Sequence, residues 1–299
     1  MKVIDAHLHF SKCDGFDRIA VAAGHENTPE DLERTFAETG IVLGIAMGEM
    51  GGVRTEGVCS PRSPNLAGTV KPGEKYPHPP FIAYCAGVES REIVPETASR
   101  SIAEFERHLQ TQECVGIKLY PGYNACYLND PIHYPYYELA ERYNVPVVIH
   151  TGEVAGTRGL LKHSHPLTVD EVAANFPNVR FVMAHYGNPW IVDATAVAAT
   201  NPNVYLDLSG LAEGNFTADW FWSHFKGQME FTKMWLTYLN NWDKVLYGSD
   251  WPLVNIPAYL EVIRRLVPEE CQEKVFFENA CRVFPKVNAL LAAAGKTAL

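Results

Sequence analysis

The sequence predicts an α/β protein, a single-domain (β/α)8 TIM barrel over residues 1–299 with a long irregular insertion after the second strand. Eight short runs that are nearly continuous in Val, Ile, Leu or Phe recur along the chain, as is typical of strands covered on both faces. Helical patterns separate most of these runs, which favours parallel strands joined by helical crossovers. A doubly wound open sheet is the alternative, but no G-x-G-x-x-G follows any strand.

The N-terminal part of the chain contains the first two predicted strands with a helix between them. The first strand begins the chain at Val3–Phe10. Thr28-Pro29-Glu30-Asp31 then supplies an N-cap, a proline at the first helical position and acidic residues in the first turn. We expect this helix to reach about Thr39, where Gly40 ends it. The second strand follows at Ile41–Met47.

An irregular segment interrupts the alternation between Gly51 and Pro80. It is rich in Gly, Pro and Ser and has no helical period where a crossover helix is expected. Loops of this length are uncommon in compact domains unless they are functional or link parts of an assembly. We therefore expect a lid or an assembly arm here.

The rest of the chain contains six further apolar runs and the helices between them. We expect strands at Phe81–Val88, Val115–Tyr120, Val145–Ile149, Val179–Ala184, Val204–Leu208 and Val245–Gly248. Helical spacing or capping signals predict helices at Pro95–Gln110, at Tyr136–Tyr143, from a capping box at Thr168–Glu171 to Phe176, and at Pro257–Val267, with a helical tail after them.

Composition and charge limit the kinds of partner. Hydrophobic residues make up 47% and charged residues 20% of the 299 residues, the profile of a soluble globular protein. The formal net charge is −10 and no Lys/Arg cluster stands out, so we expect no nucleic-acid partner and no membrane partner. Small molecules are the expected partners.

The compartment is predicted from the cysteines and from the chain's start. The seven cysteines are odd in number and scattered, and they contain no C-x-x-C pair, which indicates free thiols in a reducing compartment. No apolar run approaches the length of a membrane span. Because the first predicted strand begins at Val3, we expect no signal peptide and a cytoplasmic protein.

Polar side chains interrupt the apolar runs at the carboxyl ends of five predicted strands. In a (β/α)8 barrel these ends meet at one mouth, where the active site lies. The residues are His7, His9, Lys118, His150, His185 and Asp250.

These residue types favour a metal site. His7 and His9 are two residues apart on one strand, so their side chains share a face. Such a pair alone is more often two hydrogen-bonded core histidines than two ligands. Convergence of imidazoles and a carboxylate from several strands suits Zn²⁺, with Mn²⁺ or Fe²⁺ less favoured by the ligand types.

Six motifs together resemble the amidohydrolase superfamily. They are Asp5–His9, Gly116–Pro121, His150–Gly152, Ala184–Gly187, Tyr247–Pro252 and Glu278–Phe284. The branch they most resemble is the amidohydrolase-related group that includes aminocarboxymuconate-semialdehyde decarboxylase and other aromatic-acid decarboxylases. The resemblance covers nearly the whole chain, and the ordered set is specific although each motif alone is not.

The resemblance implies a divalent metal, most simply Zn²⁺, held by His7, His9, His150 and Asp250. His185 would lie beside it as the polarising or proton-handling group. Lys118 sits where binuclear members carry a carboxylated lysine that bridges two metals. The expected content is therefore one ion, or two if Lys118 is carboxylated.

Hydrolysis is the expected reaction. A bound Zn²⁺ lowers the pKa of its water from about 16 to about 7, so that hydroxide is available at neutral pH. Asp250 would take the proton and return it to the leaving group, while His185 or the metal polarises the carbonyl of an amide, ester or lactone. Asp207 would orient a ligand. The same ligands suit a non-oxidative decarboxylase of an aromatic or related carboxylic acid, and an inactive metal-binding module is the third alternative.

Residues near the predicted ligands give the expected substrate contacts. Arg158 lies in the Gly-containing segment Glu153–Pro166, and an arginine there is suited to hold the carboxylate of an acidic substrate. A solvated positive loop is the equally favoured alternative. Tyr120, Tyr123 and Asn124 follow Lys118 and would line the same pocket.

An aromatic segment follows the seventh predicted strand. Phe216–Trp222 is followed by Trp235 and Trp242. Such a patch on a catalytic-face loop either stacks on a flat substrate or packs against another subunit. We expect an interface or lid, and hence a homo-oligomer.

Overall fold

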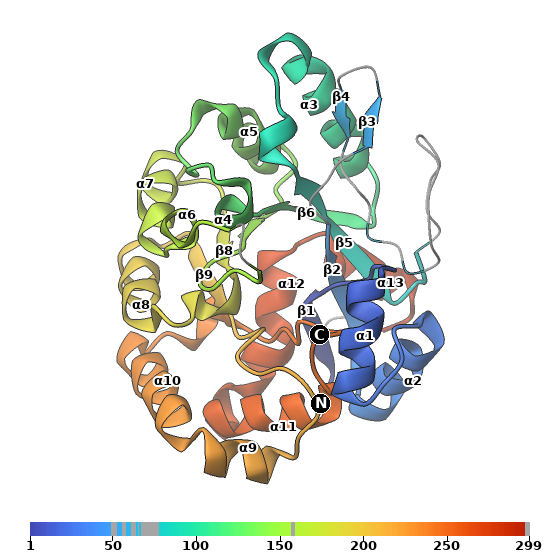
Figure 1. The fold of residues 1–299 in the computed structure, drawn as a ribbon, viewed down its shortest axis with the longest axis vertical. Helices are drawn as coiled ribbons and strands as arrows, with labels where there is room; N and C mark the ends of the chain where they lie inside the picture. The colour runs from blue at the N-terminus through green and yellow to red at the C-terminus, as the bar shows by residue number, and fades with distance from the viewer. Residues whose placement is uncertain are drawn as a thin grey trace.

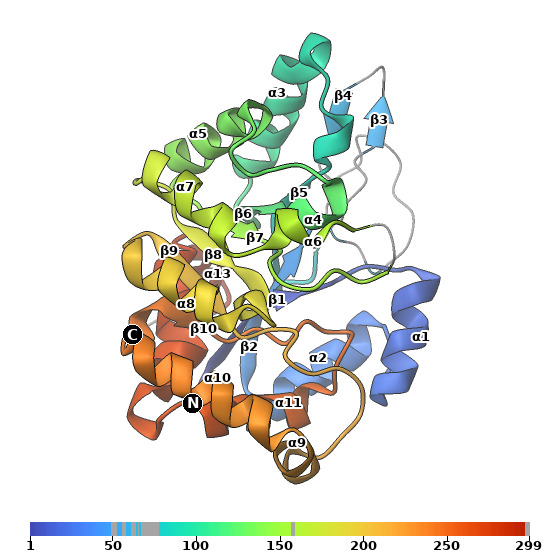
Figure 2. The same ribbon diagram turned by 60° about the vertical axis from the view of Figure 1, so that its left-hand side comes forward.

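A computed structural model describes residues 1–48, 53–55, 58–60, 64, 66, 78–156 and 159–296. Its main sheet has eight parallel strands in the order β1-β2-β5-β6-β7-β8-β9-β10, which curve into a barrel (Figures 1 and 2). The strands are β1 (Val3–Leu8), β2 (Ile41–Met47), β5 (Ile82–Val88), β6 (Cys114–Leu119), β7 (Val147–Ile149), β8 (Phe181–Met183), β9 (Val204–Asp207) and β10 (Val245–Leu246). The predicted TIM barrel is confirmed, and each expected strand lies within two residues of the observed one.

The barrel closes between β1 and the segment after β10. Ala6 N–H donates to Tyr247 O at 3.0 Å, and His9 N–H donates to Trp251 O at 2.6 Å. Asp250 N–H donates to His7 O at 2.8 Å between them. The seam that completes the barrel therefore runs through the residues that were expected to carry the chemistry.

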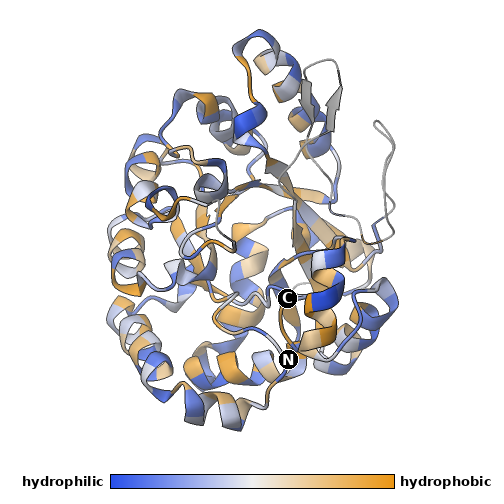
Figure 3. Ribbon diagram, in the orientation of Figure 1, coloured by the Kyte–Doolittle hydropathy of each residue, from blue (hydrophilic) through white to orange (hydrophobic). Residues whose placement is uncertain are grey.

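Helices surround the strands, and Figure 3 shows hydrophobic colouring along much of the central sheet and mixed colouring on the outer helices. The helices are α1 (Asp14–Ala23), α2 (Pro29–Thr39), α3 (Ala98–Leu109), α4 (Pro121–Asn124), α5 (Tyr134–Arg142), α6 (Leu161–Ser164), α7 (Leu167–Asn175), α8 (Ile191–Thr200), α9 (Ala218–His224), α10 (Lys226–Leu239), α11 (Ile256–Leu266), α12 (Asn279–Val283) and α13 (Val287–Ala293). None of the helices in the described part of the chain combines the length and apolarity that a membrane span requires.

Local signals explain where α2 starts and stops. Thr28 Oγ1 accepts a hydrogen bond from Asp31 N–H, and Pro29 occupies the first turn. Gly40 ends the helix with a φ of 76°, in the left-handed region that glycine adopts without strain. These are the boundaries that the sequence predicts.

Two local expectations are wrong. The Thr168 capping box does not start α7, because the helix begins at Leu167 and Thr168 Oγ1 donates to His165 O at 2.7 Å. The aromatic segment expected as a loop forms α9, which Thr217 caps by accepting from Trp220 N–H. Helices α1, α8 and α10 were not anticipated.

The expected insertion contains a short antiparallel hairpin of β3 (Val53–Thr55) and β4 (Val58–Ser60). Most other residues of the 51–80 segment lie outside the described residues. Its role as a lid or an assembly arm stays a prediction.

The C-terminal segment fills the amino end of the barrel, and we call its buried residues the C-terminal plug. The plug packs against side chains of the barrel interior such as Ile4, Leu43 and Val115. Lys286 fixes it by donating to the carbonyl oxygens of Leu109, Thr111 and Cys114. The plug residues are Phe277, Ala280, Val283, Phe284, Val287 and Leu291.

Candidate metal centre

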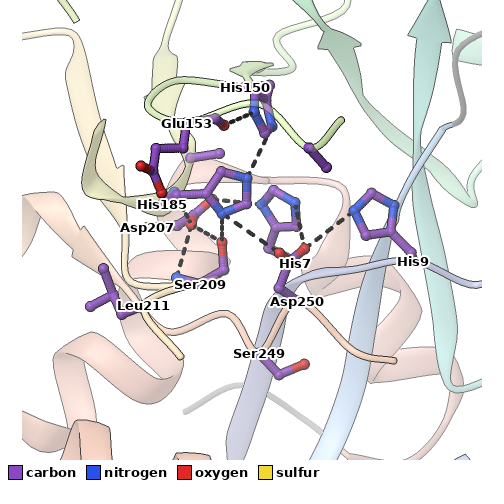
Figure 4. Close-up of polar contacts among 12 residues, drawn as sticks. His7, His9, His150, Glu153, His185, Asp207, Ser209, Leu211, Ser249 and Asp250 are labelled. Carbon is purple, nitrogen blue, oxygen red and sulfur yellow. Dashed lines mark hydrogen bonds and ion pairs between the residues drawn. The ribbon is translucent and has the colours of Figure 1, made fainter. Parts of the chain in front are cut away.

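His7, His9 and Asp250 form a three-residue cluster at the carboxyl end of β1 (Figure 4). The Nε2 atoms of His7 and His9 lie 3.5 Å and 3.2 Å from Asp250 Oδ1. One ligand atom from each residue lies within 4.8 Å of the others, a spacing that one cation can bridge. Residues separated by most of the chain thus converge at one point.

An unusual turn directs Asp250 into this cluster. Asp250 has a φ of 65°, in the left-handed region that aspartate tolerates better than most residues. Its N–H donates to His7 O at 2.8 Å. Gly248 precedes the turn, and a Cβ there would lie 2.7 Å from His7 Cβ. The chain therefore needs glycine at this position to bring Asp250 against β1.

Asp207 sets the orientation of His7. Asp207 Oδ2 lies 2.8 Å from His7 Nδ1, so Nδ1 carries the donated proton and Nε2 presents a lone pair. Asp207 Oδ1 accepts from the N–H groups of His185 at 3.0 Å and Ser209 at 3.1 Å. One carboxylate at the end of β9 thereby fixes two histidines.

Burial and charge keep these groups in metal-binding protonation states. Burial lowers the pKa of His7 to about 4, so its ring is neutral at physiological pH. Burial alone would raise the pKa of Asp250, but the imidazoles of His185 and His9 hold it well below its usual value. The pKa of Asp207 is likewise low, because His7 outweighs the effect of burial. Neutral imidazoles and ionised carboxylates are the forms that bind a divalent cation.

Unsatisfied atoms test whether a metal fits. Within the described part of the chain, His7 Nε2 and Asp250 Oδ1 are buried and accept no well-aligned hydrogen bond, although His9 Nε2 lies 3.2 Å from Asp250 Oδ1. Each such atom costs free energy when left alone, and these two lie only 3.5 Å apart. Both carry lone pairs that face the same point, so a divalent cation would satisfy them together.

A second arrangement links His150 to His185. Nε2 of His185 lies 3.1 Å from Nδ1 of His150, whose Nε2 donates to Glu153 O at 2.8 Å. Nδ1 of His185 lies 3.0 Å from Ser209 Oγ and 3.8 Å from Asp250 Oδ2. Both ring nitrogens of His150 are therefore engaged. Among the described residues, a second cluster that could hold a metal ion consists of His7, His185 and Asp207, and neither cluster includes His150.

Comparison with known proteins decides the family. The sequence profile of a family described as "Amidohydrolase" matches residues 78–286, more than half of the chain. The chain belongs to the amidohydrolase family. It is an enzyme of a family that usually binds a divalent metal and acts on small molecules.

One curated relative matches this amidohydrolase over a short stretch. Protein fluG of Emericella nidulans is 40% identical over 65 residues, which cover 22% of this chain and 7% of that protein. The chain thus aligns with only a small part of fluG.

Solved structures share the fold of this amidohydrolase. An uncharacterised TIM-barrel protein from Bordetella bronchiseptica is 19% identical over 96% of this chain and 99% of its own, with a TM-score of 0.63. 2,6-Dihydroxybenzoate decarboxylase from Rhizobium is 13% identical over 95% and 99%, with a TM-score of 0.61. A probable 2-pyrone-4,6-dicarboxylic acid hydrolase from Acinetobacter baumannii, with citric acid bound, is 15% identical over 95% and 100%, with a TM-score of 0.57. At these identities the likeness concerns the fold.

Lys118 lies on the floor of the amidohydrolase mouth. The side chain is completely buried, and its Nζ has no hydrogen-bond partner among the described residues. Nζ lies 5.0 Å from the centre of the Tyr120 ring. Burial lowers the pKa of Lys118 to about 8, although the charges of Asp207 and Asp250 oppose the shift.

The other expected substrate contacts have three different outcomes. Tyr120 and Tyr123 lie beside His150, with ring centres 6.1 Å and 4.9 Å from it. Asn124 instead supports a turn, because its Oδ1 accepts from Ser90 N–H at 2.6 Å. Arg158 lies outside the described residues.

Ser209, Gly210 and Asp5 are site residues that the sequence reasoning missed. Ser209 bonds to His185 as described, and a Cβ on Gly210 would lie 2.6 Å from Nδ1 of the same ring. Asp5 hydrogen-bonds to the backbone around Asp250. The available signal was position, since Ser209 and Gly210 follow Asp207 at a strand end and Asp5 shares a strand face with His7.

Proposed function

We propose that this amidohydrolase is a metal-dependent hydrolase that cleaves an amide, ester or lactone of a small compound. The observation that supports it most is the pair of buried lone pairs on His7 Nε2 and Asp250 Oδ1, which accept no well-aligned hydrogen bond among the described residues. With His9 they offer two imidazoles and a carboxylate at one point. This donor set fits a zinc enzyme that keeps an open coordination position.

His7, His9 and Asp250 would hold the ion, with His150 as a further ligand if its ring turns away from His185. Zn²⁺ is the proposed metal and Mn²⁺ the alternative. When bound, the ion supplies Lewis acidity and water of lowered pKa. A second ion requires that Lys118 be carboxylated, and the lowered pKa of about 8 gives its buried amine a larger share of the neutral form that reacts with CO2 than an ordinary lysine has at neutral pH.

Asp250 and His185 would handle protons. Asp250 is ionised at neutral pH and so is able to accept a proton from the attacking water and pass it to the leaving group. His185 Nδ1 lies 3.8 Å from Asp250 Oδ2, and Figure 4 shows His185 and His9 on opposite sides of Asp250. There it would polarise the carbonyl or stabilise the charge that develops on its oxygen.

The proposed substrate is small and acidic, with a planar part. The rings of Tyr120 and Tyr123 beside His150 lie at 75° to each other and give an aromatic wall with two faces, either of which can contact a planar group. Arg158 would hold a carboxylate. The same wall also suits an aromatic acid, and for this reason the decarboxylase stays the second candidate.

Metal counting separates these candidates. Protein purified with bicarbonate and excess zinc is expected to hold two ions per chain, and Lys118→Ala to hold one. A pH-stat screen of lactones should then detect acid release, and a screen of amides should detect released amine, and Asp250→Asn should abolish either activity. One ion per chain, unaffected by Lys118→Ala, together with CO2 release from aromatic acids, would instead establish the decarboxylase. Ligand binding without turnover in either screen would leave a binding module.

We also propose a cytoplasmic homo-oligomer. Six cysteines in the described part of the chain are free thiols, as a reducing compartment favours. Helix α10 exposes Phe231, Met234 and Tyr238 on its outer face, and Tyr238 is 70% exposed. Light scattering should give a dimer or larger assembly that Met234→Glu dissociates, with Val21→Glu, on exposed α1, as the control.

A further inference from the structure

Asp5 lies in the seam that closes the barrel, beneath the metal-centre cluster. Its side chain is completely buried on β1. Oδ1 accepts a hydrogen bond from Ser249 N–H at 2.9 Å and a longer one from His7 N–H at 3.3 Å. One carboxylate oxygen thus ties the strand that carries His7 to the turn that carries Asp250.

The turn depends on such ties because its backbone is strained. A non-glycine residue at a φ of 65° is strained, and it persists when surrounding contacts fix it. Ser249 N–H also lies 3.1 Å from His7 O, and Trp251 N–H donates to Ser249 Oγ at 2.9 Å. Within the described residues, Asp5 supplies the only side-chain oxygen of β1 that hydrogen-bonds to this turn.

We propose that Asp5 is a positioning residue that fixes the Ser249–Asp250 turn so that Asp250 Oδ1 faces the imidazoles of His7 and His9. Figure 4 shows Ser249 below Asp250, whose carboxylate lies beside the rings of His7 and His9. The inference rests on the proposed role of Asp250 as a metal ligand. It adds a residue that touches neither metal nor substrate and acts through the backbone.

The proposed positioning role of Asp5 requires one hydrogen-bond acceptor, its Oδ1 atom. Its Oδ2 has no hydrogen-bond partner within the described residues, so the contacts depend on one oxygen. Burial raises the pKa of Asp5 to about 7, and Oδ1 accepts from both N–H groups whether or not the carboxyl is protonated. An amide oxygen provides the same acceptor at the same distance, so asparagine should substitute for this residue.

The test compares Asp5→Ala with Asp5→Asn in the full-length chain loaded with Co²⁺. For Asp5→Ala we expect the Co²⁺ dissociation constant to rise about 10-fold or more and the visible Co²⁺ spectrum to change, because the carboxylate leaves the ion. If a hydrolysed substrate is known, kcat should fall about 100-fold while KM stays nearly constant. Asp5→Asn should restore each value to within about 5-fold of wild type.

Asp31→Ala is the matched control, because Asp31 is another nearly buried aspartate, 6% exposed, that lies on α2 away from the cluster. It should lower the melting temperature and leave Co²⁺ binding and its spectrum unchanged. If Asp5→Ala does not fold, Asp5→Ser replaces it, since a serine hydroxyl is one atom too short to reach Ser249 N–H. Wild-type Co²⁺ binding and spectrum in these variants, or an Asp5→Asn variant as impaired as Asp5→Ala, would overturn the proposal.

A double-mutant cycle distinguishes this inference from the proposed function. If Asp5 acts through Asp250, Asp5→Ala should change the Co²⁺ dissociation constant much less in an Asp250→Asn background than in wild type. Additive effects would overturn the inference even if the enzyme proves to be a hydrolase. Strong coupling in a protein that hydrolyses nothing would support the positioning role and count only against the proposed reaction.

Discussion

The same eight strands form both ends of the barrel, but apolar side chains fill the amino end and polar side chains line the carboxyl end. At the amino end, apolar side chains of the C-terminal plug, such as Phe284 and Val287, fill the space between the strands. Lys286 there donates to three carbonyl oxygens. At the carboxyl end, the buried atoms His7 Nε2, Lys118 Nζ and Asp250 Oδ1 make no well-aligned hydrogen bond among the described residues.

This difference separates stability from function within one fold. Burying apolar surface at the plug stabilises the chain by roughly 25 cal/mol per Å². Buried polar atoms without partners at the mouth each cost about 1–3 kcal/mol. A chain retains such atoms where a ligand satisfies them, and sites that break the rules of stability are expected to be functional. Variants at the two ends should therefore fail in different ways.

The largest effect is expected from removing both β1 imidazoles. His7→Ala with His9→Ala should reduce bound zinc from the wild-type content to below about a tenth of an ion per chain, because a lone carboxylate binds the ion weakly. Hydrolysis should be lost with the metal. The circular dichroism spectrum should stay that of the folded barrel, since these side chains lie at the mouth. Elemental analysis after gel filtration measures the metal.

A variant distant from both ends provides the control. Tyr238→Ser lies on the outer face of α10, and its side chain is 70% exposed. It should keep the wild-type zinc content. Stoichiometric zinc in the double histidine variant would mean that the ion binds elsewhere. The carboxyl end of the barrel would then no longer be the proposed metal site.

At the opposite end, Phe284→Ala should reduce stability and leave the metal in place. The Phe284 side chain is completely buried among plug and barrel residues. Truncating such a side chain removes apolar contacts and leaves a cavity, at a cost of about 4 kcal/mol of unfolding free energy. Urea denaturation of the zinc-free protein measures the loss. A folded Phe284→Ala fraction that binds less zinc than wild type would show that the two ends are coupled.

The sequence predicts the plugged barrel better than it predicts the mouth. Apolar runs locate strands because burial on both faces demands continuous hydrophobicity, and Ile41–Met47 is predicted to the residue. Helix α8 was missed because Ile191–Thr200 is mostly apolar and carries only a weak amphipathic pattern. The false capping box at Thr168 arose because a local motif competes with the turn that starts at Pro166.

At the mouth, the sequence indicates which polar residues sit at strand ends but not how their rings face. His7, His9 and Asp250 are neighbours in the structure. The pairing of His150 with His185 depends on ring orientation and on Glu153 O, a backbone atom that carries no residue signal. The contact of Asp5 with Ser249 N–H is of the same kind, since it joins residues 244 positions apart. Such contacts follow from how the barrel closes.

The smallest predicted effect concerns the buried Lys118 at the mouth and the partly buried Lys286 at the amino end, and it depends on pH. Burial lowers the pKa of Lys118 from 10.5 to about 8 in the folded chain. Between these values the unfolded chain binds more protons than the folded chain, so stability from this residue rises with pH. Relative to Lys118→Met, wild type should gain about 3 kcal/mol of unfolding free energy as pH rises from about 7.5 to about 10.5.

Denaturation of metal-free protein without bicarbonate at several pH values measures this gain, and Lys286→Met is the matched control. Because three carbonyl oxygens accept from Lys286, the control should lose stability at every pH. Lys118→Met should instead be tolerated at neutral pH, where the variant removes a buried ammonium that has no hydrogen-bond partner within the described chain. If the difference in unfolding free energy between wild type and Lys118→Met did not change with pH, Lys118 would have an ordinary pKa. The Lys118 ammonium would then be stabilised at the mouth as well as the Lys286 ammonium is at the amino end.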